Sequence, residues 1–426
     1  MTPALLTAIP PGKPYEDLAS YAASGGYRAL GDALSGSGPS PAGVLRLVEE
    51  AGLRGRGGAA FPAARKWALA AAAGGSPKHV VANGGEHEPG SLKDRLLVAR
   101  HPHKVIEGMA LCAYATGASE GWLYLIEDMS EAVERAEEAA REARAAGLLG
   151  PARQDGGFRF EVRVVKAPPT YVAGEETAAL EVIEGRKPWP RRKPPFPGES
   201  GLFGRPTTVN NVETLACVPG IVRRGPEWFR SLGTRGGVGT MLFTLDDRVE
   251  RPGVHEMPMG ATFRELLYEA GGGPVDKRPL RALLPATSSR FLPASRLDLP
   301  MTHEDVKAAG SSLGCGGLSF LLEGECVVER AAALAGFFKR EQCGQCPACR
   351  METSTLAAVL EQVRRGEAGD YASQIEKIVA FAAGKGHCSL IPMAAAPVVS
   401  ALELFPEDFA HHASRGRCPG APAPPR

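Results

Sequence analysis

Apolar residues follow two different periods along the chain, and these periods predict where strands and helices lie. Between residues 77 and 165, short apolar runs alternate with longer stretches whose apolar residues are three and four positions apart. The runs predict strands at 80–82, 122–126 and 158–164, and the stretches predict helices at 105–114 and 130–147. We expect Ser130 to cap the second helix and Gly147 to end it. Alternating strands and helices predict βαβ units in a mostly parallel sheet.

The pattern changes twice further along the chain. Residues 241–245 and 249–254 predict two strands joined by a turn, and Thr262 and Glu265 have the capping-box spacing that opens a short helix. These elements predict a small domain of two strands and a helix. After residue 325 the period is helical throughout, which predicts a bundle of four helices at 331–340, 351–365, 371–383 and 393–405.

Charge and hydropathy restrict the classes of partner. Among 426 residues, Lys and Arg number 49 and Asp and Glu number 48, which leaves a formal net charge of +1. This balance forces no basic surface onto nucleic acid and favours small-molecule or protein partners. No apolar stretch approaches the ~18 residues of a membrane span, and the N-terminus lacks the features of a signal peptide. We therefore expect a cytoplasmic protein with no direct membrane insertion.

Four of the nine cysteines gather in the last fifth of the chain and predict a metal site. Cys343, Cys346 and Cys349 have CxxCxxC spacing, and Cys388 can supply a fourth thiolate from another helical connection. One loop with three such thiolates can wrap three corners of an iron–sulfur cubane. Zinc is the alternative, because thiolates suit a tetrahedral ion and His387 is a spare ligand. Zinc usually takes its ligands as separated pairs, so the spacing favours iron–sulfur.

Three glycine-rich or acidic segments are candidates for a small-molecule site. Residues 53–62 with Lys66 combine unhindered backbone amides with a cation, as a phosphate site requires, although a flexible loop has the same composition. Residues 83–90 follow a predicted strand, where open α/β sheets bind ligands, or form a simple polar turn. Residues 174–177 contain two adjacent carboxylates, which also suit a helix N-terminus. The proline-rich residues 185–206 are a linker or an ordered functional loop.

Taken together and in order, six motifs resemble those of one family. They are Leu-Arg-Gly-Arg-Gly-Gly-Ala-x-Phe-Pro (53–62), Asn-x-x-Glu-x-Glu-Pro-Gly-x-x-Lys-Asp-Arg (83–95), Tyr-x-x-Gly-Glu-Glu-Thr (171–177), Lys-Pro-Pro-Phe-Pro (193–197), Pro-Thr-Thr-Val-Asn-Asn-Val-Glu-Thr (206–214) and the CxxCxxC motif. The string resembles the NADH-binding flavoprotein subunit of respiratory complex I and the diaphorase subunits of NAD-linked hydrogenases and formate dehydrogenases. The resemblance covers roughly residues 15 to 412.

The resemblance implies an α/β plus all-α fold in three parts. We expect a Rossmann-like FMN- and NADH-binding domain at 1–232, a β-grasp domain at 233–324 and a four-helix bundle with a [4Fe-4S] cluster at 325–412. The remaining residues, 413–426, are expected to be a disordered tail.

The resemblance also implies residue roles. Glu88, Glu176 and Tyr171 would place the nicotinamide and shape its pocket. Further residues would hold FMN and NADH: Gly55, Gly57, Gly58, Lys66, Asn83, Glu86, Gly174, Glu175, Lys193, Phe196, Asn210 and Asn211. Cys343, Cys346, Cys349 and Cys388 would bind the cluster.

The implied activity is that of an NADH:acceptor oxidoreductase subunit. NADH gives a hydride and a cluster accepts one electron, so a flavin is needed to split the pair. The resemblance further implies a small thioredoxin-like [2Fe-2S] subunit and another iron–sulfur subunit as partners. These subunits would place the chain peripherally on the inner face of the membrane.

Five departures from the family pattern lie in the expected cofactor pocket. Gly85 replaces an aspartate, His87 a small residue and Ala173 a cysteine, while Pro169-Thr170 and Leu69 differ from the usual residues. These departures favour a paralogue that acts in another complex. Because Gly85 lacks the carboxylate of the usual aspartate, we expect a change in FMN affinity or in its reduction potential. The alternative function is a structural or electron-relay subunit that keeps the cluster without the flavin.

Overall fold

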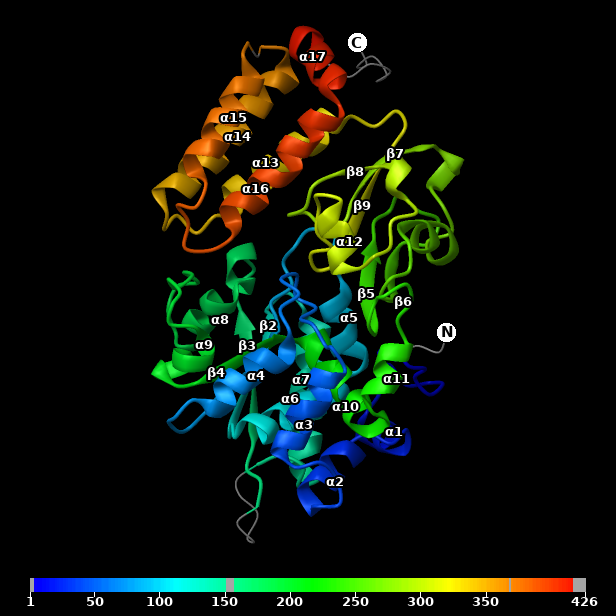
Figure 1. Cartoon of the computed structure of the whole chain (residues 1–426), viewed down its shortest axis with the longest axis vertical. Coiled ribbons are helices and arrows are strands. Elements are labelled where there is room, and N and C mark those ends of the chain that lie inside the picture. The colour runs from blue at the N-terminus through cyan, green and yellow to red at the C-terminus, as the bar shows by residue number, and fades with distance from the viewer. Residues whose placement is uncertain (1–3, 151–156, 368, 417–426) are drawn as a thin grey trace. The chain divides into compact units, whose positions relative to one another are not determined.

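The structure is a computed structural model that describes residues 4–150, 157–367 and 369–416 (Figure 1). Its described residues form two compact units. The first comprises residues up to His87 with Ser91–Phe243 and Val254–Ala261, and the second comprises Glu88–Gly90, Thr244–Gly253 and the chain from Thr262 onward. The expected bundle thus falls wholly within the second unit, whereas the expected β-grasp segment is divided between the two units, and the division into three domains stays a prediction.

The first unit is built on the parallel sheet that the βαβ pattern predicts. Its strand order is β3-β2-β1-β4 and every pairing is parallel, so the predicted sheet is confirmed. The strands are β1 (His79–Gly84), β2 (Glu120–Ile126), β3 (Glu161–Ala167) and β4 (Thr207–Asn211). Val80, Val81 and Ala82 in β1 are fully buried, as expected for a strand covered on both faces.

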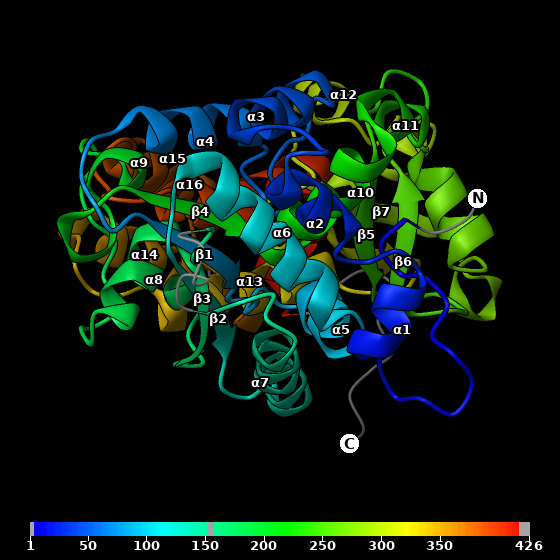
Figure 2. The ribbon, with the colours of Figure 1, turned by 90° about the horizontal axis from the view of Figure 1, so that it is seen from below.

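Helices pack on both sides of this sheet. Helix α6 (Pro102–Thr116) contacts β1 and β2, and α10 (Val212–Arg224) packs against α6 (Figure 2). The other helices of this unit are α1 (Leu18–Ala23), α2 (Arg28–Ser35), α3 (Pro41–Glu50), α4 (Ala63–Ala72), α5 (Lys93–Arg100), α7 (Ser130–Ala145), η1 (Tyr171–Gly174), α8 (Glu176–Ile183), α9 (Pro197–Ser200), η2 (Leu202–Gly204) and α11 (Pro226–Ser231).

The predicted ends of α7 are half right. Gly147 has a φ of +70° just after the helix, in the left-handed region that favours glycine, as expected. Ser130 is already the first helical residue, whereas Met129 occupies the cap position and makes no side-chain capping bond. The expected Ser130 cap is therefore wrong, because the serine lies one position inside the helix that it would have to precede.

The second sheet has the strand order β6-β5-β9-β7-β8. Its strands are β5 (Thr240–Leu245), β6 (Gly253–Pro258), β7 (Leu280–Leu284), β8 (Leu292–Pro293) and β9 (Gly317–Leu322). Strand β5 runs parallel to β9, and β7 is antiparallel to β8 and β9. The return strand expected at 249–254 begins only at Gly253, because Pro252 cannot donate to a ladder, and Val249 forms an isolated bridge with Pro274.

The capping box predicted at Thr262 is confirmed. The Thr262 amide donates to Glu265 Oε2 at 2.7 Å, and the Glu265 amide donates to Thr262 Oγ1 at 3.1 Å. The helical turn that follows, η3 (Glu265–Ala270), is wound as a π-helix. The short elements of the same unit are η4 (Val275–Lys277), η5 (Ala294–Arg296) and α12 (His303–Ala308).

The predicted four helices are present, and a fifth follows them. They are α13 (Val327–Glu341), α14 (Pro347–Arg365), α15 (Tyr371–Ala382), α16 (Leu390–Leu404) and α17 (Pro406–Arg415). Residues 413–415 are therefore helical, contrary to the expected tail, and residues 417–426 lie outside the described part of the chain. Leu284, Phe291 and Leu321 share one buried core with α13, α14 and α16, which joins β7 and β9 to the bundle within the second unit.

Helices long enough to cross a membrane were sought among the described residues. No single helix combines the necessary length and apolar character, and only the bent pair of α16 and α17, at 91°, meets both conditions together.

We predict that Gly108, in the middle of α6, accepts no larger residue. A Cβ there would lie 2.0 Å from the carbonyl oxygen of Leu215 in α10, so Gly108→Ala must push two helices apart. We expect a loss of about 3 kcal/mol in unfolding free energy, measured by denaturant titration. Gly31→Ala in α2 is the matched control, since its Cβ would meet nothing within 4 Å, and should gain about 0.5–1 kcal/mol. Equal effects of the two substitutions would contradict this packing.

Candidate functional site

Most of the expected cofactor residues lie at the carboxyl ends of the parallel strands in the first unit. Asn83 stands near the end of β1, and Asn210 and Asn211 end β4. Glu88 belongs instead to the second unit, in the short segment Glu88–Gly90, where the Pro89 carbonyl accepts from Thr287 Oγ1 at 2.9 Å. The structure thus gathers the first group at one sheet edge, and the role of Glu88 stays a prediction.

The glycine-rich segment closes into a tight loop before α4. The Gly55 amide donates to the Phe61 carbonyl at 2.9 Å, and Arg54 and Pro62 form a β-bridge. Gly58 has a φ of +109°, which side chains rarely adopt, and a Cβ on Gly57 would lie 3.2 Å from Asn211 Cβ. Backbone amides are therefore displayed without side chains beside the end of β4. This cradle is the kind of surface that anions bind.

Asn83 joins the end of β1 to η1. Its Nδ2 donates to the Gly174 carbonyl at 2.9 Å, and its Oδ1 accepts from the Gly85 amide at 2.9 Å. The two glycine backbones touch, because a Cβ on Gly174 would lie 2.4 Å from the Gly85 carbonyl oxygen. A Cβ on Gly85 would meet Gly174 Cα at 3.0 Å and Tyr124 at 3.1 Å, which leaves no space for the family's usual aspartate in this arrangement. The departure at Gly85 thus accompanies a close backbone contact.

The side-chain amides of Asn210 and Asn211 differ in how many of their hydrogen-bonding positions remain available to a cofactor. Asn211 accepts from Lys93 and from the Glu213 amide, and donates to the Asn83 carbonyl and to Asp94. All four hydrogen-bonding positions of that amide are therefore used inside the protein. Asn210 is 6% exposed, and within the described chain its Nδ2 has no hydrogen-bond partner. A buried amide without a partner costs free energy, so Asn210 fits a site that a polar cofactor completes.

A buried charge cluster supports Asn211 from behind. Lys93 is fully buried, and its Nζ lies 2.6 Å from Asp94 Oδ1, 2.9 Å from Glu213 Oε2 and 3.2 Å from Asn211 Oδ1. Burial raises the pKa of Glu213, and the charge of Lys93 opposes that rise. Two acidic side chains and one ammonium thus fix the amide that the glycine loop packs against.

The carboxylate of Glu86 is engaged at the start of α5. Its Oε1 accepts from Ser91 Oγ at 2.6 Å and from the Asp94 amide at 3.0 Å, and its Oε2 accepts from the Arg95 amide at 3.1 Å. Burial, followed by the charge of Asp94, raises the pKa of Glu86. The side chain satisfies amides at the α5 N-terminus, and its expected contact with a cofactor stays a prediction.

The acidic pair expected at 175–176 forms the start of α8. Glu175 is its N-cap and accepts from the Thr177 and Ala178 amides through Oε2, at 2.8 and 2.9 Å. Glu176 binds two lysines from different segments: Lys66 Nζ lies 2.9 Å from its Oε2, and Lys193 Nζ 2.8 Å from its Oε1. Burial alone would raise the pKa of Glu176, but the two ammonium groups outweigh it and lower the pKa. Glu176 is therefore ionised at neutral pH.

The aromatic residues near this pair differ in exposure. Tyr171 is half-buried in η1, whose Ala173 carbonyl accepts from Tyr124 at 2.9 Å. Phe61 and Phe196 are 41% and 51% exposed, and the Lys66 ammonium lies 6.0 Å from the Phe61 ring centre. Rings with this exposure can stack on a planar ligand.

The four expected ligand cysteines come together in the second unit. Cys346 is the N-cap of α14, Cys349 lies in its first turn, and Cys388 precedes α16 by two residues. Burial raises the pKa of Cys349 to about 12, and the charges of Cys388, Cys343 and Cys346 add to this rise, so the thiols share one neighbourhood. No group of three or more His, Cys, Asp or Glu side chains in the described ranges is arranged to hold a single metal ion.

The surroundings of the cysteines suit an iron–sulfur cluster. The His387 amide donates to Cys346 Sγ at 3.4 Å, and the His387 ring pairs with Gln345 Oε1 at 2.5 Å. Amide donors to ligand sulfurs stabilise the charge of a cluster, and four thiolates at the ends of two helices are its usual donor set. The residues present therefore fit a [4Fe-4S] cluster.

Glu352 lies one helical turn beyond Cys349. It is fully buried, and neither of its carboxylate oxygens has a hydrogen-bond partner in the part of the chain that the structure describes. Burial raises the pKa of this side chain to about 8. Glu352 is therefore mainly protonated at neutral pH, so that it adds little negative charge beside the thiolates.

Curated proteins of similar sequence cover nearly the whole chain. An F subunit of NADH-quinone oxidoreductase from Rhizobium meliloti is 41% identical over 405 residues, which cover 94% of this chain and 96% of the relative. The corresponding F subunit from Escherichia coli K12 is 39% identical over 404 residues, covering 92% of this chain and 88% of the relative. The chain belongs to the F-subunit family of NADH-quinone oxidoreductases.

Family models place the parts of this F-subunit family member along its sequence. The Nuo51 FMN-binding domain matches residues 48–220, the SLBB domain matches 247–281, and the NADH-ubiquinone oxidoreductase-F iron–sulfur binding region matches 329–412. The first covers the glycine loop, Asn210 and Glu176, and the last covers all four ligand cysteines. The expected cofactors, FMN and a [4Fe-4S] cluster, are thereby confirmed for the family, and the zinc alternative finds no support.

Solved structures show the same fold. A chain in the crystal structure of an NAD+-reducing [NiFe]-hydrogenase in the H2-reduced state matches with a TM-score of 0.81 at 30% identity. The match covers 95% of this F-subunit family member and 66% of the hydrogenase chain. The chain in the air-oxidized state matches with a TM-score of 0.77, at 31% identity, over 88% of the present chain and 63% of its own length. The present chain thus spans just under two thirds of those chains, and the α/β plus all-α fold is confirmed.

Sequence reasoning missed three residues of this F-subunit site. Lys93 and Asp94 stand in the motif 83–95 and were given no role, although a Lys-Asp pair directly after a glycine-rich turn was the available signal. Glu213 follows Asn211 in the motif 206–214 and binds Lys93 across the fold. Only the structure brings these two motifs together, because nothing in their spacing predicts the contact.

We predict that Lys93→Met strongly destabilises the first unit. Its loss would remove the ammonium that directly pairs with the buried carboxylates of Asp94 and Glu213, which costs about 3–5 kcal/mol. Lys166→Met is the matched control, since the Lys166 side chain is 56% exposed and only 3.3 Å from Glu137 on the surface, where a pair contributes about 0–1 kcal/mol. Chemical denaturation of both variants measures the difference. A Lys93→Met variant as stable as the control would contradict the stabilising role of the buried charge cluster.

We predict that the stability cost of Glu352 grows with pH. The pKa of Glu352 is about 8 in the fold against an ordinary 4.5, so the folded state binds more protons between these values and loses stability as pH rises. The difference in unfolding free energy between Glu352→Gln and wild type should therefore grow by about 2 kcal/mol, in favour of the variant, as the pH rises from 6 to 8. Melting temperatures of the anaerobic holoprotein measure this gain.

Glu361→Gln, at a more exposed position of α14, is the matched control for Glu352→Gln. The hydrogen bond from Arg364 lowers the pKa of Glu361 to about 2, so Glu361 is fully ionised throughout that pH range. A gap between Glu352→Gln and wild type that is constant from pH 6 to pH 8 would contradict the assignment.

Proposed function

We propose that the chain is the electron-input subunit of an NADH oxidoreductase complex, with NADH and FMN bound in the first unit and a [4Fe-4S] cluster in the second. The observation that carries the proposal is the shared carboxylate of Glu176, which binds Lys66 beside the glycine loop and Lys193 of the proline-rich loop at once. Two segments, each with a cation suited to the phosphate of a nucleotide ligand, therefore meet at one side chain.

We assign the flavin phosphate to the glycine loop. The amides of Gly57 and Gly58 would bind its oxygens, while the Gly55 amide closes the loop onto the Phe61 carbonyl. The Lys66 ammonium, next to the Val209 carbonyl at 3.3 Å, would neutralise the phosphate charge. The partner-free amide of Asn210 would complete its hydrogen bonds with the cofactor. Asn83, Asn211 and Gly174 would act as supports, because their contacts hold the walls in place.

We assign NADH to the side of α8 where Lys193 of the proline-rich loop binds Glu176. The Lys193 ammonium would bind a phosphate, and the exposed ring of Phe196, three residues later, would stack on adenine. Glu176 and Tyr171 would orient the nicotinamide, and Glu175 would hold Lys193 at 3.1 Å. Glu86 is assigned to the same pocket from the family motif alone, and the role of Glu88 stays a prediction.

FMN, when bound, supplies the exchange of a hydride for single electrons that the cluster can accept. The protein's own residues need transfer no proton to a substrate. Glu176 stays ionised and fixes two cations, which positions the phosphates of both ligands. Cys343, Cys346, Cys349 and Cys388 would ligate the cluster, and the His387 amide would stabilise its negative charge.

The chain acts in a multi-subunit assembly of the NADH-quinone oxidoreductase or NAD-linked hydrogenase kind. We propose a small thioredoxin-like [2Fe-2S] subunit and a second iron–sulfur subunit as its partners. Through them the chain would lie at the inner face of the membrane.

An anaerobic visible spectrum before and after NADH tests the proposal. We expect flavin and cluster absorbance in the purified protein, bleaching of the flavin band by NADH, and steady reduction of ferricyanide. In Cys343→Ser the cluster should be lost while NADH still bleaches the flavin, which separates the two sites.

Two outcomes would contradict this function. Protein with measured flavin and iron that fails to reduce ferricyanide with NADH would refute the activity. Protein with about four irons per chain and no flavin would favour the alternative relay role.

A further inference from the structure

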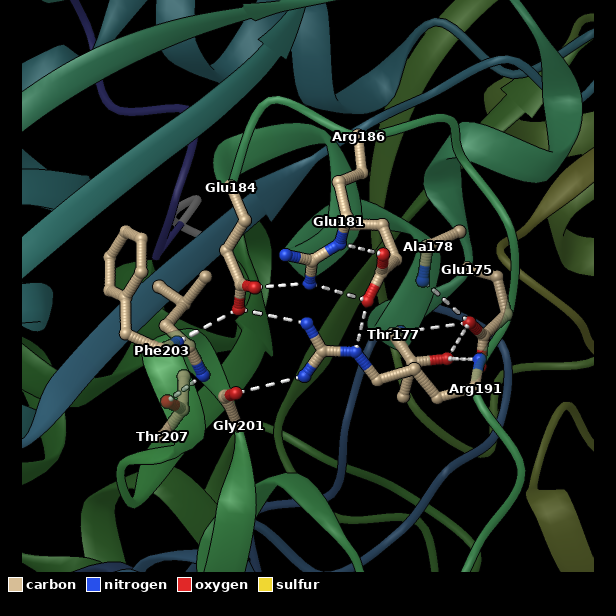
Figure 3. Close-up of polar contacts among 11 residues, drawn as sticks. Glu175, Thr177, Ala178, Glu181, Glu184, Arg186, Arg191, Gly201, Phe203 and Thr207 are labelled. Carbon is tan, nitrogen blue, oxygen red and sulfur yellow. Dashed lines mark hydrogen bonds and ion pairs between the residues drawn. The ribbon is translucent and has the colours of Figure 1, made fainter.

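The proline-rich loop (185–206) is held to α8 and to Glu184 by a dense set of charged contacts (Figure 3). Two arginines, Arg186 and Arg191, both bind the carboxylates of Glu181 and Glu184. Glu184 also accepts from the Phe203 amide at 2.8 Å, near the far end of the loop. The arginines hold the pKa of Glu181 below its usual value, and burial only partly opposes them.

Arg191 makes contacts that Arg186 does not. Its Nε lies 2.5 Å from Glu181 Oε1, its Nη2 2.8 Å from Glu184 Oε1 and its Nη1 2.8 Å from the Gly201 carbonyl. One guanidinium therefore joins α8, the beginning of the loop and the turn before β4. Planar guanidinium groups suit such multiple contacts because their donors are fixed in direction.

The same residue connects to the acidic pair at the start of α8. The Arg191 amide donates to Thr177 Oγ1 at 2.9 Å, and Thr177 Oγ1 donates to Glu175 at 2.5 Å. Glu175 in turn binds Lys193, two residues beyond Arg191. A continuous path of hydrogen bonds thus leads from the Arg191 backbone amide, which the guanidinium holds in place, to the ammonium that we assign to NADH.

We infer that Arg191 is a positioning residue for NADH: its guanidinium clasps the proline-rich loop onto α8, which presets Lys193 and Phe196 for the nucleotide. The inference rests on the proposed function, since it deepens the assignment of those two residues. Without the clasp, the loop must be ordered when the nucleotide binds, and this entropy cost weakens binding. We expect hydride transfer from bound NADH to proceed at an unchanged rate.

Arg186 provides a matched control within the same network. It contacts the same two carboxylates, carries the same charge and is more exposed, at 53% of its side chain against 26% for Arg191. Among the residues drawn in Figure 3, only Arg191 reaches Gly201. Comparing the two alanine substitutions therefore isolates the clasp from the loss of a positive charge.

The test measures binding of ADP-ribose, which carries the adenine and phosphates of NADH but no hydride, to the FMN-loaded protein by calorimetry. We expect Arg191→Ala to weaken ADP-ribose about tenfold and to raise the KM for NADH similarly. The ferricyanide kcat and the FMN content should stay within about twofold of wild type. Arg186→Ala should leave all four quantities near wild type.

A conservative variant keeps the test decisive if Arg191→Ala folds poorly. Arg191→Lys retains the charge but cannot contact Glu181, Glu184 and Gly201 together, so it should bind ADP-ribose with intermediate affinity. Equal ADP-ribose affinity in Arg191→Ala, Arg186→Ala and wild type would overturn the inference. A kcat loss without a change in ADP-ribose affinity would overturn it too. Wild-type protein that fails to bind ADP-ribose or NADH would instead refute the proposed function.

Discussion

The ion pairs of Glu176 are the interaction on which the rest of the site depends. A carboxylate at the N-terminus of α8 binds Lys66 and Lys193, which come from segments 127 positions apart in a 426-residue chain. Lys66 lies in α4 and Lys193 in the proline-rich loop, so the start of α8 is a common attachment point for two distant segments. Because the pair of ammonium groups outweighs burial, the pKa of Glu176 is lowered and the charge persists at neutral pH. The two cations that we assign to phosphates are thus arranged around one negative charge.

The parallel sheet explains why these loops meet. Carboxyl ends of parallel strands share one edge. There η1 and α8 follow the end of β3, and the glycine loop packs against Asn211 at the end of β4. Beneath it, Lys93 and its acidic partners hold the Asn211 amide, while the bare backbones of Gly85 and Gly174 touch. The expected cofactor surface is therefore supported by buried charges and by close backbone contact. The arginine clasp of the proline-rich loop is a third support of the same kind.

Much of this could be predicted from the sequence, and the limits have physical causes. The sheet and the bundle follow from the period of apolar residues, which is a local property, and the ligand role of the four cysteines, inferred from their spacing, stays a prediction. The Ser130 cap and the strand at 249–254 were wrong, because a one-residue shift of a helix start and a proline at 252 decide such ends. Asn211 was assigned to the flavin, although its amide is fully used by Lys93, Asp94, Asn83 and the Glu213 amide. Contacts between distant motifs carry no signal in a single sequence.

The central claim is that electrons from NADH reach the cluster by way of the flavin. Low-temperature electron paramagnetic resonance of the anaerobic holoprotein tests it directly. NADH should produce the same reduced-cluster signal that dithionite produces. The signal should be absent after removal of FMN and return when FMN is restored. A cluster that dithionite reduces but NADH does not, or that NADH reduces equally well without FMN, would contradict this account.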